Sequence, residues 1–415
     1  MISETDARAK ILEVVRQLPP RKMSILQALD HFAAEDYFAR LPLPMFDNSA
    51  MDGYAVIASD CKSGSRLRVI GEQPAGVDRQ LRVSNGETIR IFTGAPIPAG
   101  ANAIVMQEDV TRTGDEIVIN VDVDGEEFVR KRGCDLGEGQ KILGKGDRIV
   151  ATRLALLASQ GFIDVVVGGE ARAAIISTGD ELAKAGEKLQ PGQIYDSNSI
   201  LLQSLLKRSG AVVASAQHCG DDAKSLRKAF EAASKNEIAI VTGGVSVGEH
   251  DLVQSTLREL GAKIDIRRVA IKPGKPFLFG QLKQTGPSPQ SSPRPGRGSR
   301  EVAGEGRDCL VFGLPGNPVS AFVTFLQFVR PAILKMMGAI DLELPKIQAK
   351  LTVDLANDSD RAHYLRGKLE NGNFAPIGRQ ESHALFGLSQ SNALLRVETG
   401  ESFKSGEMVQ VHVWE

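Results

Sequence analysis

The chain has 415 residues, more than one hydrophobic core usually supports, so several domains are expected. Its 50 Lys and Arg residues nearly balance 51 Asp and Glu residues, which argues against a dedicated nucleic-acid or membrane-surface binder. The sequence suggests neither a membrane span nor a signal peptide, so a cytoplasmic location is expected. Its four cysteines form no C-x-x-C pair, and neither a disulfide framework nor a structural zinc site is indicated.

The first part of the chain combines helices with short β segments. Apolar residues at helical spacing predict a helix that stops before Pro19, and the range 25–39 predicts a second amphipathic helix. A further helix is expected to contain Leu154 and to end near Gly161. Alternating apolar residues, separated by glycine and proline, predict four strands of a β-rich domain: Arg66 to Gly71, Thr88 to Phe92, Ala103 to Met106 and Glu116 to Val121.

Apolar strands in the second half of the chain end in turns that carry glycine, proline or charged residues. Helices that begin near Asp196 and Asp221 separate these strands. Strand–helix alternation over roughly 160 residues predicts a doubly wound, mostly parallel sheet whose loops meet at one edge. The four turns are Thr178-Gly179-Asp180-Glu181, Thr242-Gly243-Gly244, Lys272-Pro273-Gly274-Lys275 and Pro315-Gly316-Asn317-Pro318.

Taken one at a time, these turns are weak indications of function. The glycine loop lacks the Gly-Lys-Ser/Thr ending of a P-loop and the spaced glycines of a dinucleotide fingerprint. A lysine pair is often a solvated turn, and Asp180 and Glu181 could simply cap a helix. Their common position at strand exits instead favours a site for a phosphorylated ligand with a divalent cation.

Two parts of the chain near the carboxyl end differ in composition and pattern from the strand–helix alternation. Alternating residues in the ranges 350–355, 394–397 and 408–413 predict a small, barrel-like β domain. The segment 284–307 contains 13 Pro, Gly or Ser residues among 24 and is predicted to be a disordered surface insertion. It interrupts an expected hairpin that returns to the strand ending at Leu314.

Seven long motifs carry a resemblance to a known family. In the amino-terminal half they are PLPMFDNSAMDGYAV (42–56) and FTGAPIPAGANAIVMQED (92–109). In the second half they are TGDEL (178–182), GQIYDSNS (192–199), TGGVSVGEHD (242–251), IKPGKP (271–276) and GLPGNPVSA (313–321). The chain resembles the molybdopterin molybdenumtransferases, which include the bacterial MoeA proteins and the E-domain of gephyrin. The motifs follow the family's order along the whole chain.

The resemblance implies a multi-domain α/β fold with four domains. Residues 1–44 and 137–168 would form an elongated helical and β dimerisation domain, with a β-rich domain of residues 45–136 inserted into it. Residues 169–338 would form the α/β molybdopterin-binding domain, which contains the insertion 284–307. Residues 339–415 would form the C-terminal β domain.

The resemblance also implies a reaction. The family takes adenylylated molybdopterin and molybdate, cleaves the pyrophosphate bond in a Mg²⁺-dependent step, inserts the metal into the dithiolene and releases AMP. A homodimer with composite active sites is implied. The upstream adenylyltransferase and the chaperones of downstream molybdoenzymes are the other expected partners.

The same resemblance assigns site residues in three groups. The catalytic carboxylates would be Glu181, Asp180, Asp251 and Asp52, and the first three of these would hold Mg²⁺. Cations and hydroxyls suit a tetrahedral oxyanion, and the molybdate-binding residues would be Ser246, Lys272, Lys275, Arg366 and Ser382. The residues that bind molybdopterin and its phosphates would be Thr93, Thr178, Gly179, Asp196, Ser197, Asp221, Gly243, Gly244, Pro315, Gly316, Asn317 and Pro318.

Several alternatives stay open. By residue type alone, the segment around Asp52 could be a turn with Asx hydrogen bonds, whereas the resemblance implies that Asp52 and Thr93 reach the partner's cleft. Arg366 and Ser382 are expected on connecting segments of the C-terminal domain, where Arg366 could be an ordinary exposed arginine. For the whole chain, the alternatives are an adenylyltransferase that acts one step earlier and a non-catalytic dimeric scaffold.

Overall fold

The computed structural model describes residues 1–245, 252–284 and 308–414. The chain forms two compact units. The first unit comprises Met1–Glu35, Gly146–Val150 and Asp164–Glu415, and the second comprises Asp36–Lys145 and Ala151–Ile163. Of the predicted features, Ser246, Asp251 and all but the first residue of the insertion 284–307 lie outside the described residues.

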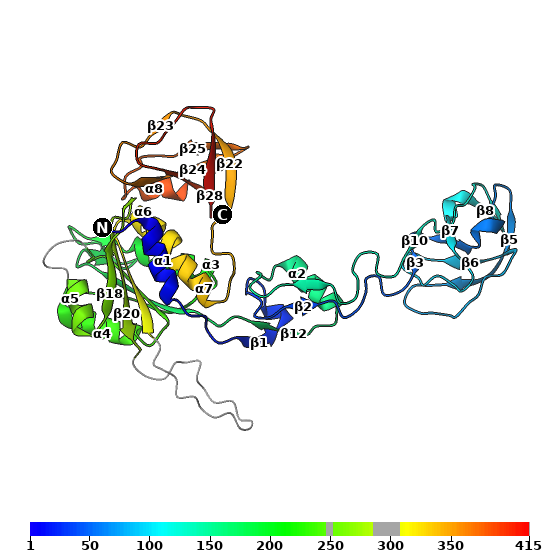
Figure 1. The fold of residues 1–415 in the computed structure, drawn as a ribbon, viewed down its shortest axis with the longest axis horizontal. Coiled ribbons are helices and arrows are strands. Elements are labelled where there is room, and N and C mark those ends of the chain that lie inside the picture. The colour runs from blue at the N-terminus through cyan, green and yellow to red at the C-terminus, as the bar shows by residue number, and fades with distance from the viewer. Residues whose placement is uncertain (246–251, 285–307, 415) are drawn as a thin grey trace, which may run out of the picture. The chain divides into compact units, whose positions relative to one another are not determined.

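A six-stranded mixed sheet forms the centre of the first unit (Figure 1). In spatial order its strands are β16 (Val212–Cys219), β13 (Arg172–Thr178), β17 (Ile238–Thr242), β21 (Asp308–Leu314), β20 (Pro276–Lys283) and β18 (Lys263–Arg268). The first four strands are parallel to one another, and β20 and β18 run antiparallel to their neighbours. The predicted parallel sheet is therefore confirmed for four strands, and the predicted hairpin is confirmed as β20 and β21.

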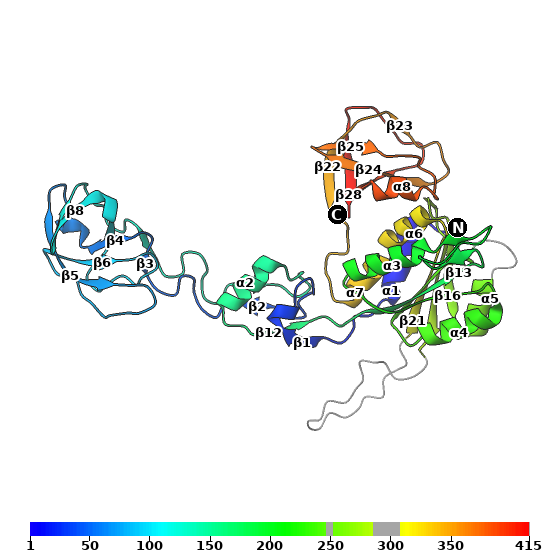
Figure 2. The same cartoon turned by 180° about the vertical axis from the view of Figure 1, so that it is seen from behind.

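Helices cover both faces of this sheet, as Figures 1 and 2 show from opposite sides. One face carries α1 (Glu4–Val14), α3 (Ser197–Arg208), α6 (Pro318–Thr324) and α7 (Arg330–Met336), and the other carries α4 (Ala223–Ala233) and α5 (Leu252–Glu259). Because successive strand residues point to opposite faces, Ile175 packs in the first apolar layer and Ile176 in the second. As predicted, Asp196 and Asp222 cap α3 and α4.

The helical segment Pro318–Met336 is long and apolar enough to cross a membrane by length and composition. It joins α6 and α7 through a π-helical turn, η4 (Phe325–Val329). However, 89% of its apolar window is buried inside the protein, so it packs as a core helix. The sequence did not suggest a span here because Thr324, Gln327 and Arg330 interrupt the apolar residues.

The carboxyl-terminal residues form a barrel-like sheet, as predicted. Its strands, in hydrogen-bonded order, are β19 (Ile271–Lys272), β24 (Ala362–Glu370), β25 (Asn373–Pro376), β22 (Lys346–Leu351), β28 (Met408–Val413) and β26 (Ala393–Val397). A further pairing of β24 with β26 closes the ring. The interior contains Leu351, Leu365, Phe374, Leu395 and Val411, all buried. Beside the ring lie α8 (Leu385–Ser389) and the pair β23 (Leu355–Ala356) and β27 (Ser402–Phe403).

The second unit contains a six-stranded sheet that includes all four predicted strands. Its order is β7 (Ala103–Met106), β4 (Gly53–Val56), β6 (Glu87–Ile91), β5 (Arg66–Gln73), β9 (Glu116–Ile119) and β8 (Val110–Thr113). The predicted helix near Leu154 is α2 (Ala151–Ser159). Short pairs complete this part of the chain: β2 (Tyr37–Phe38) with β11 (Lys141–Leu143), β3 (Asn48–Ser49) with β10 (Val129–Arg130) and, in the first unit, β1 (Arg21–Ser24) with β12 (Asp164–Val167). The four-domain division itself stays a prediction.

The predicted helix over residues 25–39 was wrong. The segment contains only a 3-10 turn, η1 (Ile25–Gln27), and Asp30 adopts a positive φ of 64° that an α-helix does not allow. Its backbone groups bond to the chain at 147–149 instead, with Asp30 N–H donating to Ile149 O and Ala33 N–H to Asp147 O. The apolar pattern therefore reflects pairing with a distant segment, which single-sequence periodicity does not show.

The lysine turn does not follow a parallel strand of the central sheet. The preceding strand, β18, is an antiparallel edge strand, and Ile271 and Lys272 form β19, which pairs with Ala362 and His363 of the barrel. The fourth parallel strand of the sheet is instead β16. The apolar pattern did not predict it because its side chains are half-exposed or exposed.

Candidate functional site

The carboxyl ends of β13, β17 and the turn after β21 meet at a cavity of about 580 Å³. The start of α3 closes another side of it. The predicted residues that line the cavity are Thr178, Glu181, Asp196, Ser197, Gly243, Gly316, Asn317 and Pro318. Sequence reasoning did not assign a role to the others that line it, which are Leu182, Ile194, Tyr195, Asn198, Thr242, His383 and Leu385.

Two of the strand-exit turns touch each other through glycines. Gly243 has φ +88°, and a Cβ atom there would lie 2.2 Å from the Thr178 carbonyl oxygen. A Cβ atom at Gly316 would lie 3.7 Å from the Cα of Gly243. Only glycine fits the first position, because both the backbone conformation and the neighbouring carbonyl exclude a side chain. The turns therefore pack backbone to backbone and leave the cavity above them.

Asn198 ties these turns together and was missed as a site residue. Its Nδ2 donates to Thr242 Oγ1 at 3.0 Å and to Gly316 O at 2.6 Å. The Thr242 hydroxyl in turn donates to Pro315 O at 3.3 Å. Asn198 is buried, and its Oδ1 has no hydrogen-bond partner among the described residues. The only signal in the sequence was its place in DSNS, directly after the helix cap at Asp196.

Acidic side chains surround the exits of β13 and β16. Asp180 and Glu181 are exposed directly after β13. Asp221, after β16, accepts a hydrogen bond from the Thr178 hydroxyl, and its N–H donates to Asp180 Oδ1 at 3.3 Å. Asp196 is also held, because its carboxylate accepts from Ser177 Oγ at 2.6 Å. The described residues hold no cluster of three His, Cys, Asp or Glu side chains that could bind a metal ion, and Asp251 lies outside them.

A second predicted group lies on the barrel. Arg366 does not sit on a connecting segment but inside β24, and it is fully buried rather than exposed. Its Nη2 donates to Arg379 O, whereas Nε and Nη1 have no partner in the described part of the chain. Burial lowers the pKa of the Arg366 guanidinium. A buried cation with unpaired donors can bind and neutralise an anion.

Lys272 is brought to the same strand by its pairing with His363. Burial and, to a smaller extent, the charges of Lys272 and Arg366 lower the pKa of His363 to about 4. Lys275 lies on the same turn as Lys272 and is half-buried. Ser382 accepts a hydrogen bond from Asn317 Nδ2 at 2.9 Å, which joins the barrel to the turn after β21.

Asp52 and Thr93 lie together in the second unit. The Asp52 carboxylate accepts hydrogen bonds from the Thr93 backbone N–H at 2.7 Å and from its hydroxyl at 2.8 Å. These two bonds hold the pKa of Asp52 below its ordinary value. The pair is a preformed acidic group, with Thr93 exposed and Asp52 half-exposed.

Three family models together cover most of the chain. The MoeA N-terminal region (domains I and II) matches residues 2–161, a probable molybdopterin binding domain matches residues 174–335, and the MoeA C-terminal region (domain IV) matches residues 348–414. The crystal structure of a molybdopterin biosynthesis MoeA protein from Pyrococcus horikoshii superposes with a TM-score of 0.77 and 30% identity, over 100% of this chain and 99% of that one. The class of protein is therefore a MoeA-type protein whose α/β domain matches the family model of a probable molybdopterin binding domain.

Curated relatives define the family. A molybdopterin molybdenumtransferase from Haemophilus influenzae is 34% identical, with 99% of this chain and 98% of the relative aligned. A protein of the same name from Nostoc is 36% identical, with 89% of this chain and 83% of the relative aligned. The chain belongs to the molybdopterin molybdenumtransferase family, a family of molybdenum cofactor biosynthesis, and it is a transferase.

Proposed function

We propose that this enzyme transfers molybdenum from molybdate to adenylylated molybdopterin, with cleavage of the pyrophosphate bond and release of AMP. The observation that carries the proposal is the fully buried Arg366, whose Nε and Nη1 have no partner among the described residues, on a strand paired with Lys272. Such an arrangement suits a tetrahedral dianion. The molybdopterin substrate would occupy the cavity at the strand exits, where Ser197 and Asn317 offer polar groups.

The reaction requires an oxygen nucleophile, from water or molybdate, to attack phosphorus. The P–O–P bond then breaks, and AMP leaves with the electron pair of the bridging oxygen or with the attacking oxygen, according to which phosphorus is attacked. Lys272, Lys275, Arg366, Ser246 and Ser382 would hold molybdate. Glu181 lines the cavity, and Asp180, the residue before it, is exposed, so their carboxylates would orient the nucleophile.

A magnesium ion fits this donor set. Mg²⁺ in phosphate chemistry usually keeps several waters and takes one or two carboxylates together with substrate phosphates. Asp180 and Glu181 supply two such carboxylates, and Asp251 would be a third. When bound, the ion would neutralise charge on the pyrophosphate as phosphorus is attacked.

The active enzyme would be a cytoplasmic homodimer. Asp52 and Thr93 would then serve the cleft of the partner subunit, which makes each site composite. The upstream adenylyltransferase would supply the adenylylated substrate, and chaperones of molybdoenzymes would receive the product.

The test is AMP release from adenylylated molybdopterin by the purified protein. We expect release that depends on both molybdate and Mg²⁺, and an adenylyltransferase or a scaffold would not show it. Glu181→Gln keeps the shape of the side chain but removes its charge, so turnover should fall about 100-fold or more. Glu187→Gln, an exposed residue of the same loop, is the matched control and should behave as wild type. Absence of molybdate-dependent AMP release would reject the proposal.

A further inference from the structure

The first residues of the chain contact the segment that precedes the lysine turn. The Ile2 N–H donates to Arg268 O at 3.2 Å, and the Ala270 N–H donates to Ile2 O at 2.9 Å. These bonds form a parallel bridge between Ile2 and Val269. The path of the chain into Lys272 is therefore set partly by the amino terminus.

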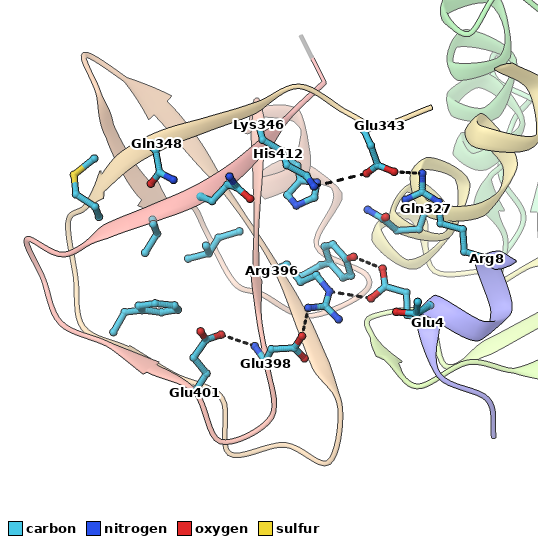
Figure 3. A pocket seen from close by; sticks show the side chains of 17 residues that line it. Glu4, Arg8, Gln327, Glu343, Lys346, Gln348, Arg396, Glu398, Glu401 and His412 are labelled. Carbon is cyan, nitrogen blue, oxygen red and sulfur yellow. Dashed lines mark hydrogen bonds and ion pairs between the residues drawn. The ribbon is translucent and has the colours of Figure 1, made fainter. Parts of the chain in front are cut away.

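Glu4, two residues later, contacts the barrel (Figure 3). One carboxylate oxygen, Oε1, accepts from the Tyr364 hydroxyl, and the other, Oε2, accepts from Arg396 Nε at 2.9 Å. The Glu4 side chain is only 12% exposed and Tyr364 is 2% exposed. Both oxygens are thus engaged in partly desolvated, charge-assisted hydrogen bonds, which are stronger than neutral ones.

The two donors come from the neighbouring strands β24 and β26, and β24 also carries Arg366 of the predicted oxyanion site. Tyr364 and Arg366 are two residues apart on β24 and therefore lie on the same face of the strand. Arg396 lies opposite Tyr364 on β26. His363, which precedes Tyr364 on β24, is the strand-pairing partner of Lys272. The chain before the lysine turn is bonded to Ile2, which precedes α1, so a shift of β24 relative to α1 would strain the pairing of Lys272 with His363.

We propose that Glu4 is a positioning residue for oxyanion binding, because it fixes the strand of Arg366 against the chain segment that leads to Lys272 and Lys275. The inference rests on the proposed function, which supplies molybdate as the oxyanion. A carboxylate suits this position because it has two acceptor oxygens for two donors. Glutamine would accept from only one donor and would turn an NH₂ group toward the other.

A second ion pair provides a matched comparison. Arg8, one turn after Glu4 on α1, pairs with Glu343, and both pairs line the same cavity of about 790 Å³ between α1 and the barrel (Figure 3). Glu343 lies before β22, so this pair anchors α1 without touching β24. Glu343→Gln therefore removes the charge from an ion pair of α1, and from the longer Glu343–Lys346 pair at 3.8 Å, and leaves the bonds to Tyr364 and Arg396 in place.

The experiment measures molybdate binding by calorimetry for the full chain and for three variants: Glu4→Gln, Tyr364→Phe and Glu343→Gln. We expect the Kd for molybdate to rise about tenfold in Glu4→Gln, since small displacements of positioned groups have large effects. Tyr364→Phe should act in the same direction but less. Glu343→Gln should bind as wild type. In the AMP assay, Glu4→Gln should raise the KM for molybdate and leave the KM for adenylylated molybdopterin unchanged, a split that general loss of structure would not produce.

The outcomes separate this inference from the proposed function. Wild type that binds molybdate but releases no AMP, together with weaker binding in Glu4→Gln, would remove the proposed function and keep the role of Glu4. Three results would overturn the inference. The first is molybdate binding equal to wild type in both Glu4→Gln and Tyr364→Phe. The others are a loss of molybdate affinity in Glu343→Gln as large as in Glu4→Gln, and a wild type that binds no molybdate. If Glu4→Gln does not fold, Tyr364→Phe decides by the same measurements.

Discussion

At the scale of single residues, stability and function oppose each other most clearly at Arg366. Its guanidinium is fully buried, and Nε and Nη1 have no partner within the described residues. Burial of this charge outweighs the attraction of the Glu381 charge, so this position is poorly explained by packing alone. An anionic substrate would supply the missing partner. The same residue would then lower the stability of the free enzyme and raise its affinity for substrate.

Arg366→Met tests this opposition. Methionine keeps an unbranched apolar chain but removes the charge, so Tm should stay the same or rise by up to a few degrees. The KM for molybdate should rise about 100-fold or more, because charge-assisted bonds to the oxyanion are lost. Thermal melts and AMP assays measure both quantities. Lys368→Met, an exposed position on the same strand, should change neither. A Tm lower by several degrees with an unchanged KM would make Arg366 a structural residue.

His363 predicts a pH dependence of stability. Its pKa falls from 6.5 to about 4 in the folded protein, chiefly through burial. Between these values the unfolded chain binds a proton that the folded chain does not, so stability decreases as the pH falls from about 6.5 to about 4. His363→Phe should remove this part of the decrease. Urea midpoints measured at several pH values test it, with His383→Phe, at an exposed position, as the control. Equal pH slopes for wild type and His363→Phe would contradict the assignment.

At the scale of elements, the strands β20 and β21 of one hairpin flank the segment 284–307, which is rich in Pro, Gly and Ser. The pairing extends to Lys283 opposite Asp308, so the two strands are held together on both sides of that segment. Leu278 and Phe279 on β20 and Val311 and Phe312 on β21 belong to the two core layers. The hairpin therefore has its own stabilising contacts up to the point where the described residues stop.

Deletion of Pro287 through Gly304 should leave Tm and AMP release nearly unchanged. The reason is compositional, since the deleted residues offer almost no apolar side chains to bury. The residues that remain on each side are enough to join Lys283 to Asp308. A loss of several degrees in a thermal melt would mean that the segment packs on the rest of the protein.

At the scale of the whole molecule, the predicted site residues are divided between the two compact units. Asp52 and Thr93 belong to the second unit, whereas Glu181, Lys272 and Arg366 belong to the first. The second unit is inserted into the first, because the chain leaves at residue 35 and returns finally at residue 164. A composite site in a dimer would require Asp52 from one subunit and Glu181 from the other.

Mixing two inactive variants tests this arrangement. Asp52→Ala and Glu181→Gln would each be inactive alone, but a mixed dimer would contain one cleft with both defects and one with neither. Activity should return to about a quarter of wild type after complete exchange, because about half of the dimers are mixed and each has one intact site. Native mass spectrometry verifies the exchange. Mixtures that stay inactive despite verified exchange would place Asp52 and Glu181 in the same cleft or remove Asp52 from the reaction.

The local signals in the sequence determined the strands, the capped helices and the turns at the strand exits. Continuous apolar runs identified β13, β17 and β21, and Asp196 marked the start of α3. Family motifs then indicated the transferase, and the curated relatives confirmed it. These features depend on residues close together in the chain, so a single sequence contains them.

Tertiary structure alone decided which distant residues meet. It paired residues 30–33 with 147–149, where the apolar pattern predicts a helix, and it placed Lys272 on the barrel beside His363. It also buried Arg366 within β24 and brought Glu4 to Tyr364 and Arg396, more than 300 residues away in the sequence. Contacts of this kind arise from the packing of whole elements, so they cannot be predicted from the spacing of residues along the chain.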